Sequence, residues 1–170
     1  NGCDTTYTFT LIDPPLLLVD VVTTDNLCFG DCAGTATITV GGGVAPYAIE
    51  WRDAAGAIIE VNTTAIDSLC AGDYSVLVTD ANGCLLQTPF AITQGTPIDA
   101  TITFSNETCF GPCDGTAAVT PSGGTAPYTF FWQPPPGSGQ GTDQVSGLCE
   151  GNYTLTITDA LLCDTTISFT

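Results

Sequence analysis

Apolar and polar residues alternate with a period of two along much of this chain. The pattern is clearest over residues 46–52 and 73–79, where large apolar side chains occupy every second position. Alternation of this kind predicts β-strands that bury one face and expose the other. Thr, Val and Ile are abundant, whereas Lys, Arg and Met are nearly absent, which favours strands over helices. The predicted fold class is therefore all-β.

The pattern is repeated about 80 residues along the chain. The sequence CFGDCAGT at 28–35 recurs as CFGPCDGT at 109–116. Three more segments recur in the same order: 42–47 at 123–128, 69–74 at 148–153, and 79–84 at 158–163. Four motifs in one order predict two modules of the same fold.

We assign the two modules to residues 13–94 and 95–170. Residues 1–10 resemble 161–170 in sequence, so residues 1–12 are interpreted as the last strand of a preceding repeat. The chain is accordingly interpreted as a piece of a longer tandem array. The joints at 13–15 and 94–97 are short, which predicts that the modules stack end to end.

Seven short strands are expected in each module. Those of the first are 16–24, 35–40, 46–52, 57–61, 64–67, 73–79 and 84–93. Those of the second are 98–105, 116–120, 127–133, 141–143, 144–147, 152–158 and 163–170. The dipeptide Asn82-Gly83 predicts a type I′ hairpin turn before the last strand of the first module. Short strands with a turn signal every 8–12 residues are typical of an antiparallel, immunoglobulin-like (Ig-like) β-sandwich.

Aromatic side chains follow the alternation in both modules. The six that are in phase with the apolar positions are Tyr47, Trp51, Tyr74, Tyr128, Trp132 and Tyr153. They could form a platform on which sugars stack, but their phase on two strands favours core packing. The two tryptophans fall on the third strand of each module, which is the Ig-like position.

The charge of the chain excludes several functions. One Lys or Arg stands against 18 Asp and Glu, so the net charge is −17, and there is no His. Nucleic acids and anionic membranes need a cationic face, so neither is expected as a partner. Without His or Lys, imidazole catalysis, Schiff bases and phosphate-binding loops are excluded. A carboxylate pair of the glycosidase type is the one catalytic arrangement that remains. We expect neither an enzyme nor a bound cofactor.

Nine cysteines in 170 residues indicate an oxidising compartment, because none of them forms a Cys-x-x-Cys pair of the zinc-binding type. Cys32 and Cys70 each precede a strand that starts at the same end of the predicted sandwich. Cys32–Cys70 and its repeat Cys113–Cys149 are therefore the preferred bridges within modules. A Cys28–Cys32 bridge is the local alternative.

A second pairing follows from end-to-end stacking, which brings the Cys28 end of one module against the Cys163 end of the next. We hypothesise a Cys28–Cys163 disulfide that locks this joint. Cys84, Cys3 and Cys109 would then pair with neighbouring repeats. The alternative is a free thiol at each joint.

Four aspartates recur near the module ends and are candidate calcium ligands: Asp31, Asp80, Asp114 and Asp159. No Asp-x-Asp-x-Asp loop accompanies them, and Asp80 and Asp159 suit turn capping equally well. Calcium is thus the one ion that these residues suggest.

Taken together, the motifs resemble a known family. The order is Cys-x-Gly-x-Cys-x-Gly-Thr, then Gly-Gly-x-x-Pro-Tyr-x-x-x-Trp, then Leu-Cys-x-Gly-x-Tyr, with a final Cys. It is similar to the SprB repeat of very large cell-surface adhesins of Bacteroidota, including the mobile gliding adhesin. The resemblance covers nearly the whole chain, twice. Leu161-Leu162 departs from the Asn-Gly that the family favours.

The resemblance implies a structural and adhesive segment of a long extracellular surface protein exported by the type IX system. Its partners would be neighbouring repeats of the same chain, and surface polysaccharide. A subunit of a self-assembled filament or sheath, which would contact identical chains, is the alternative. A carbohydrate-active accessory module ranks third, because the acidic residues lie at turns and not as a converging pair.

Two surface features add to this interpretation. Thr5, Ser68 and Thr165 lie in Asp-Ser/Thr contexts that resemble the O-glycosylation acceptor of Bacteroidota. The stretch 134–141, rich in Pro and Gly, has no counterpart in the first module and is the expected variable contact loop.

Overall fold

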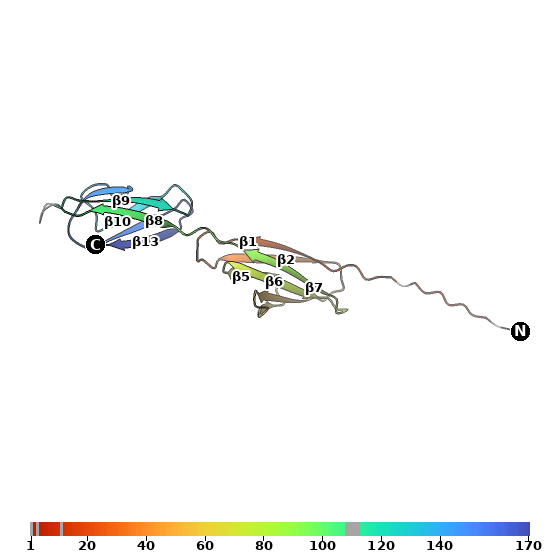
Figure 1. The fold of residues 1–170 in the computed structure, drawn as a ribbon. Coiled ribbons are helices and arrows are strands. Elements are labelled where there is room, and N and C mark those ends of the chain that lie inside the picture. Colours follow the sequence, from red (N-terminus) through yellow and green to blue (C-terminus); the bar gives the residue numbers. More distant parts are fainter. Residues whose placement is uncertain (1, 3, 11, 108–112) are drawn as a thin grey trace. The chain divides into compact units, whose positions relative to one another are not determined.

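The structure is a computed structural model that describes residues 2, 4–10, 12–107 and 113–170. The secondary structure of this part consists of antiparallel β-strands, shown in Figure 1. The strands of the first half are β1 (Leu18–Thr24), β2 (Gly34–Gly41), β3 (Ala48–Asp53), β4 (Ile58–Val61), β5 (Ala65–Leu69), β6 (Gly72–Thr79) and β7 (Leu85–Ile92). Those of the second half are β8 (Asp99–Ser105), β9 (Gly115–Ser122), β10 (Thr129–Gln133), β11 (Gln144–Leu148), β12 (Tyr153–Thr158) and β13 (Asp164–Phe169). The all-β prediction is confirmed. Among the described residues no helix has the length and hydropathy needed to cross a membrane.

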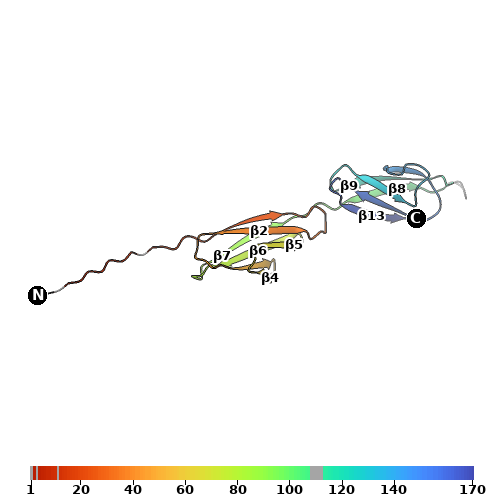
Figure 2. The same cartoon turned by 180° about the vertical axis from the view of Figure 1, so that it is seen from behind.

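The chain forms two compact Ig-like units. In unit 1, a sheet of order β1-β2-β5 packs on a sheet of order β4-β3-β6-β7. In unit 2, the corresponding sheets are β11-β9-β8 and β10-β12-β13. Figure 2 shows the strands of each unit from the opposite side. The second unit thus repeats the sandwich of the first.

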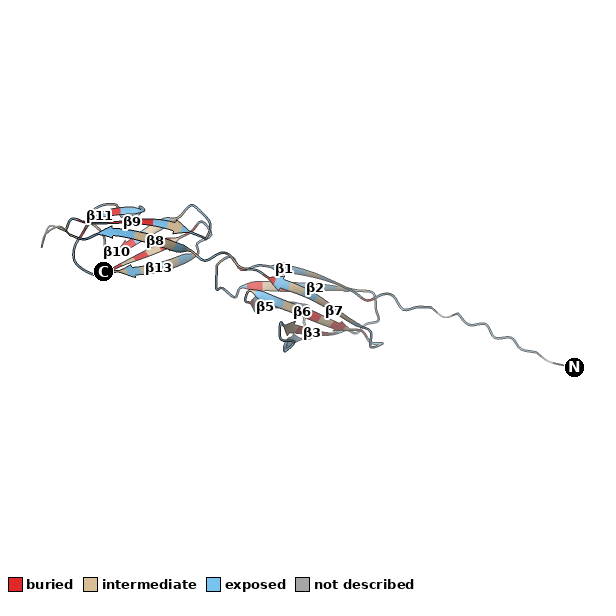
Figure 3. Ribbon diagram, viewed as in Figure 1, coloured by how far each residue is buried: buried red, intermediate tan, exposed pale blue. Residues whose placement is uncertain are grey.

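Each unit has its own core, built on the predicted third strand. Trp51 and Trp132 are fully buried, on β3 and β10. The indole N–H of Trp51 donates to the carbonyl oxygen of Thr63 at 3.0 Å, and that of Trp132 donates to Thr142 at 2.9 Å. Burial alternates along β2, β6, β9 and β12 (Figure 3), and the buried apolar positions of these strands belong to the same core cluster as the tryptophan of their unit. The period-two pattern therefore identified the inward faces.

The tyrosines lie at the border of the cores. Tyr153 is buried, whereas Tyr47, Tyr74 and Tyr128 are half-buried and pack against the core residues. Each phenol donates to a main-chain carbonyl oxygen nearby: Tyr47 to Gly42, Tyr74 to Cys70, Tyr128 to Gly123 and Tyr153 to Cys149. These hydrogen bonds explain why Tyr occupies these positions, because a partly buried phenol needs a polar partner.

The structure corrects two local predictions. The strand expected at 141–143 does not form. Pro134 follows β10 at once, and a run of prolines has few main-chain N–H groups with which to continue a hairpin. The turn at Asn82-Gly83 is not type I′, because only Gly83 of the two has a positive φ, of 83°.

The unit boundaries also differ from the sequence modules. Unit 1 consists of residues 1–24 and 33–92, and unit 2 consists of 25–32 and 93–170. The stretch 25–32, which lies between β1 and β2 in sequence, therefore belongs to unit 2. Residues 4–10, predicted to be a strand of a preceding repeat, have no strand structure and are exposed.

Candidate functional site

Residues 25–32 are held in unit 2 by hydrogen bonds to the segment after β7. The N–H of Asn26 donates to the carbonyl oxygen of Thr93 at 2.9 Å, and the N–H of Thr93 donates to the carboxylate of Asp25 at 2.7 Å. The N–H of Gly30 donates to the side-chain oxygen of Gln94 at 2.7 Å. Asn26 is 3% exposed, so the attachment buries polar groups that these bonds satisfy.

A disulfide fixes the same segment covalently. Cys28 is bonded to Cys163, with a Cα–Cα distance of 5.4 Å and a sequence separation of 135. This is the pairing hypothesised from the repeat, and it rules out the Cys28–Cys32 alternative in this structure. The bond joins a segment from the first sequence module to the start of the last strand of the second.

A second bond closes unit 2 at its other end. Cys113 is bonded to Cys149, with a Cα–Cα distance of 4.1 Å, which is the expected pairing. Cys32 and Cys70 are both disulfide-bonded as well, as a Cys32–Cys70 bridge would require. Cys3 and Cys109 lie outside the described residues.

Cys84 is the exposed free thiol of the described chain. It stands in unit 1 where Cys163 stands in unit 2, directly before the last strand of the sandwich. The carboxylate of Asp80 repels the thiolate and so raises the pKa of Cys84, and burial adds to this effect.

Asp80 and Asp159 are turn caps in the two units. One carboxylate oxygen of Asp80 accepts the N–H groups of Asn82 and Cys84 at 2.9 and 2.8 Å, and the other accepts that of Val44 at 3.0 Å. Asp159 accepts the N–H groups of Leu161, Cys163 and Thr125 in the same way. Both aspartates are 5% exposed. The capping role accounts for their recurrence.

The caps also set the ionisation of these carboxyls. The N–H of Cys84 is the largest influence on Asp80 and lowers its pKa, and the N–H groups of Val44 and Asn82 together help to outweigh the opposing effect of burial. At Asp159 burial is the largest influence and raises the pKa, but three backbone N–H bonds together bring it below its usual value. The negative charge is therefore favoured at both turns.

The four candidate calcium ligands do not form one cluster within the described ranges. Asp31 and Asp114 are exposed and lie in loops that are distant in sequence from the capping residues Asp80 and Asp159. One group of potential ligands does come together, with Glu107, Cys113 and Cys149 within 4.8 Å of one another. Both sulfur atoms of that group are in a disulfide, so it lacks the thiolates that a metal would bind.

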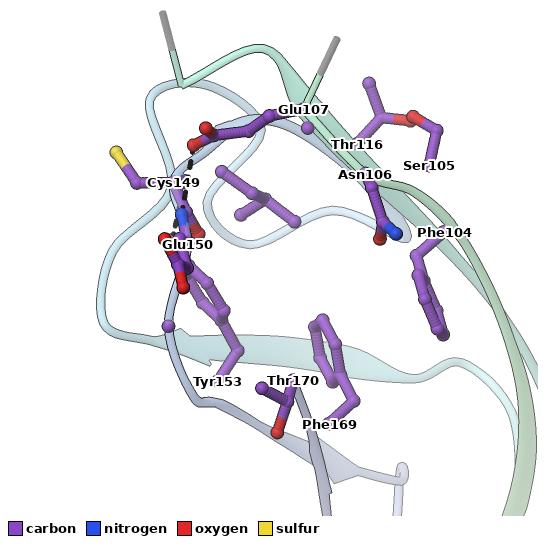
Figure 4. Close-up of a pocket in the computed structure, with 13 residues that line it drawn as sticks. Phe104, Ser105, Asn106, Glu107, Thr116, Cys149, Glu150, Tyr153, Phe169 and Thr170 are labelled. Atoms are coloured by element: carbon purple, nitrogen blue, oxygen red, sulfur yellow. Dashed lines mark hydrogen bonds between the residues drawn. The ribbon is translucent and has the colours of Figure 1, made fainter. Parts of the chain in front are cut away.

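Unit 2 has an open pocket of about 520 Å³ at the end of β13. Figure 4 shows Phe104, Tyr153 and Phe169 along its wall and Glu107 and Cys149 at its rim. The ring of Phe169 stacks on those of Tyr153 and Phe104, with centroid distances of 5.7 and 6.1 Å. A carboxylate oxygen of Glu107 accepts the N–H of Glu150 at 3.0 Å. The pocket is thus apolar inside and polar at its rim, and the sequence analysis missed it.

The remaining candidates lie on the surface. Thr5 and Ser68 are exposed, and the Ser68 hydroxyl donates to Asp67 at 2.9 Å. Thr165 is half-buried on β13. In the 134–141 loop, Ser138 bridges to Ser146 on β11, so the loop packs along that edge of its sheet.

Comparison with protein-family models gives a match to the SprB repeat at residues 21–56 and again at 101–137. Each match covers the first strands of one sandwich, and the two lie 80 residues apart, as the internal repeat requires. The resemblance predicted from the cysteine, Gly-Gly and tyrosine motifs is confirmed. Comparison with curated proteins finds no match.

Solved structures with similar folds include the Ig domains of a cell adhesion molecule. The chain is 12% identical to the eight N-terminal Ig domains of the Down Syndrome Cell Adhesion Molecule, covering 91% of this chain and 24% of that one, with a TM-score of 0.47. It is 17% identical to a C-terminal fragment of intimin in complex with the intimin-binding domain of its translocated receptor, covering 93% and 64%, with a TM-score of 0.43. It is 12% identical to the two Ig domains of DIP-gamma, covering 92% of this chain and 95% of that one, with a TM-score of 0.42. The chain spans about a quarter of the length of the first of these.

Proposed function

Because the chain carries two SprB repeats, we propose that it is a structural and adhesive tandem-repeat segment of a long extracellular bacterial surface protein. The repeats point to a surface-protein module that is not catalytic. The finer proposal is a fibre-forming adhesin of a Bacteroidota cell, exported by the type IX system and serving in attachment or gliding. Oxygen-linked sugars on Thr5, Ser68 and Thr165 would belong to this proposal, as would a surface polysaccharide ligand.

The Cys28–Cys163 disulfide is the observation that carries the proposal. It ties a segment of one sequence repeat into the compact unit formed by the next. A bond of this kind serves repeats that occur in series and in an oxidising environment.

Cys84 extends the same logic to a further repeat. It has the sequence position and the Asp cap of Cys163, and its thiol is free and exposed. We therefore include in the proposal a disulfide between Cys84 and the counterpart of Cys28 in a neighbouring repeat.

The size of the native protein tests this function. An antibody against residues 13–170 would be used on a denaturing, reducing gel of the source cells, before and after protease treatment of intact cells. We expect a band many times larger than 17.5 kDa that disappears when the intact cells are treated. A band that survives the protease would contradict a surface location.

A band near 17.5 kDa would favour the alternative, a subunit of a self-assembled filament. One observation favours that alternative. Residues 4–10 match β13 in sequence, yet Tyr7 and Phe9 are 86% and 83% exposed. Such a segment could complete the sandwich of another copy by adding a strand.

A further inference from the structure

The pocket in unit 2 has a filled counterpart in unit 1. Gly34 at the start of β2 corresponds to Gly115 at the start of β9, and Leu69 corresponds to Leu148. In unit 1, the side chain of Ile92 lies over this place and is 2% exposed. The same place in unit 2 is the floor of the pocket, which Gly115 and Leu148 line.

The surroundings of the two glycines show what is different. A Cβ atom built on Gly34 would lie 2.6 Å from Cγ2 of Ile92, 2.8 Å from the carbonyl oxygen of Leu69 and 3.3 Å from that of Thr24. A Cβ atom built on Gly115 would lie 2.9 Å from the carbonyl oxygen of Leu148 and 3.3 Å from that of Ser105. The two backbone neighbours are conserved between the units, and the aliphatic side chain is the contact that unit 2 lacks.

The strand register says where that side chain would come from. In unit 1, Phe90 pairs with Tyr74 and Ile92 pairs with Gly72 on β6. In unit 2, Phe169 pairs with Tyr153, and Gly151, which also lines the pocket, stands where Gly72 stands. The counterpart of Ile92 is thus one position beyond Thr170, in line with β13.

We propose that the pocket is the receiving site for one aliphatic side chain, carried one position beyond Thr170 on an extended peptide segment that continues β13. The segment adds backbone pairing to β12, and its side chain covers Gly115 and Leu148 as Ile92 covers Gly34 and Leu69. In unit 1, the carboxylate of Asp25 accepts the N–H of Thr93, the residue after Ile92. Asn106 occupies the position of Asp25 in unit 2 and lines the pocket. Its amide oxygen is therefore available to accept an N–H of the added segment. The pocket is then a part of the sandwich and not a ligand site.

The test extends the chain by the four residues that follow Ala91 in unit 1, Ile-Thr-Gln-Gly, and compares this protein with one extended by Ser-Thr-Gln-Gly. The readout is hydrogen exchange of the amides of 144–153, which surround the pocket. We expect the Ile extension to slow their exchange by about ten- to a hundredfold relative to the Ser extension, because only Ile buries apolar surface there. The substitution Ile92→Ser should accelerate exchange of 65–74 in unit 1, which provides a matched control.

Two outcomes would overturn the inference. Equal exchange with the Ile and Ser extensions would mean that the pocket does not select an aliphatic side chain. Protection of 144–153 that rises with protein concentration in the chain without an extension would mean that a second copy fills the pocket. Neither outcome depends on whether the protein is an adhesin, since cell-surface exposure and native size are measured separately.

Discussion

Leu162 adopts a left-handed backbone conformation, with a φ of 67°, at the place where unit 1 has Gly83 with a φ of 83°. The two turns are otherwise the same. In each, the N–H of this residue donates to the carbonyl oxygen of the capping aspartate, Asp80 or Asp159, at 3.0 or 3.1 Å. The fold therefore imposes one turn on two different sequences, and unit 2 forms it with a residue that disfavours it.

Replacing Leu162 with Gly should stabilise unit 2. The left-handed conformation costs an L-residue roughly 1–2 kcal/mol, and the greater freedom of Gly in the unfolded chain takes back about 0.4–1 kcal/mol. We expect a net gain of about 0.5–1 kcal/mol, measured by urea unfolding. The leucine side chain is 81% exposed, so little packing is lost.

The reverse change provides the control. A Cβ atom on Gly83 would meet no heavy atom within 4 Å, so Gly83→Leu adds backbone strain without a clash. It should destabilise unit 1 by about 0.5–1 kcal/mol, because the lower freedom of Leu in the unfolded chain offsets part of the strain. A loss of stability in Leu162→Gly as well would show that the leucine itself makes a contact that the turn needs.

Acid should destabilise both units through their capping aspartates. The pKa values of Asp80 and Asp159 are lowered in the folded protein from the ordinary 3.8. Their contribution to stability is therefore complete above about pH 4 and is lost as the pH falls through the lower, folded values. When the melting temperature is measured from pH 6 to pH 2, it should decrease as the pH falls below about 4.

The variants Asp80→Asn and Asp159→Asn isolate this effect. Each variant keeps an oxygen that can accept N–H groups, but the amide cannot ionise. The double variant should therefore have a lower melting temperature than the wild type at pH 6, and its melting temperature should change less with pH below 4. An unchanged acid profile in the double variant would assign the acid sensitivity to other carboxylates.

Cys84 should react slowly for an exposed thiol. The carboxylate of Asp80 raises its pKa, and so a smaller fraction is thiolate at pH 8 than for an ordinary cysteine. Labelling with an alkylating reagent, followed by peptide mapping, gives its rate. Asp80→Asn should accelerate labelling, and equal rates in the two proteins would mean that the repulsion has no effect on reactivity.

Removing the long-range disulfide should destabilise the protein by about 2–5 kcal/mol, because the bond closes a long loop in the unfolded chain. The variant is Cys28→Ser with Cys163→Ser, and the measurement is urea unfolding without reductant. Cys84→Ser removes an exposed free thiol and should change the stability by less than about 0.5 kcal/mol. Equal effects of the two changes would contradict a structural role for the bond.

Much of the fold could be predicted from the alternation alone. The sequence pattern placed Trp51 and Trp132 in the cores because a half-buried strand must direct every second side chain inward. The disulfide between Cys113 and Cys149 could be predicted because both residues flank the same end of the sandwich. Local pattern and strand order were sufficient in these cases.

The remaining features depend on contacts that no local pattern encodes. The stretch 25–32 lies in the first sequence module, but its partners Thr93, Gln94 and Cys163 belong to unit 2. The pocket lies where unit 2 has no counterpart of Ile92. That correspondence is found only from the pairing of β6 with β7. The turn of Leu162 follows from the Asp159 cap and not from the residues that form the turn.

The Cys28–Cys163 bond also determines how the chain would respond to a pulling force. When tension is applied at the two ends, it enters the bond at Cys28 and leaves at Cys163, so the backbone between them carries none of it. Of the described strands only β1 and β13 lie outside this loop, and about 450 Å of extended chain is hidden inside it. A stretched molecule would therefore yield that length only after reduction, and a series of such bonds would make a tether that lengthens little before its disulfides are broken.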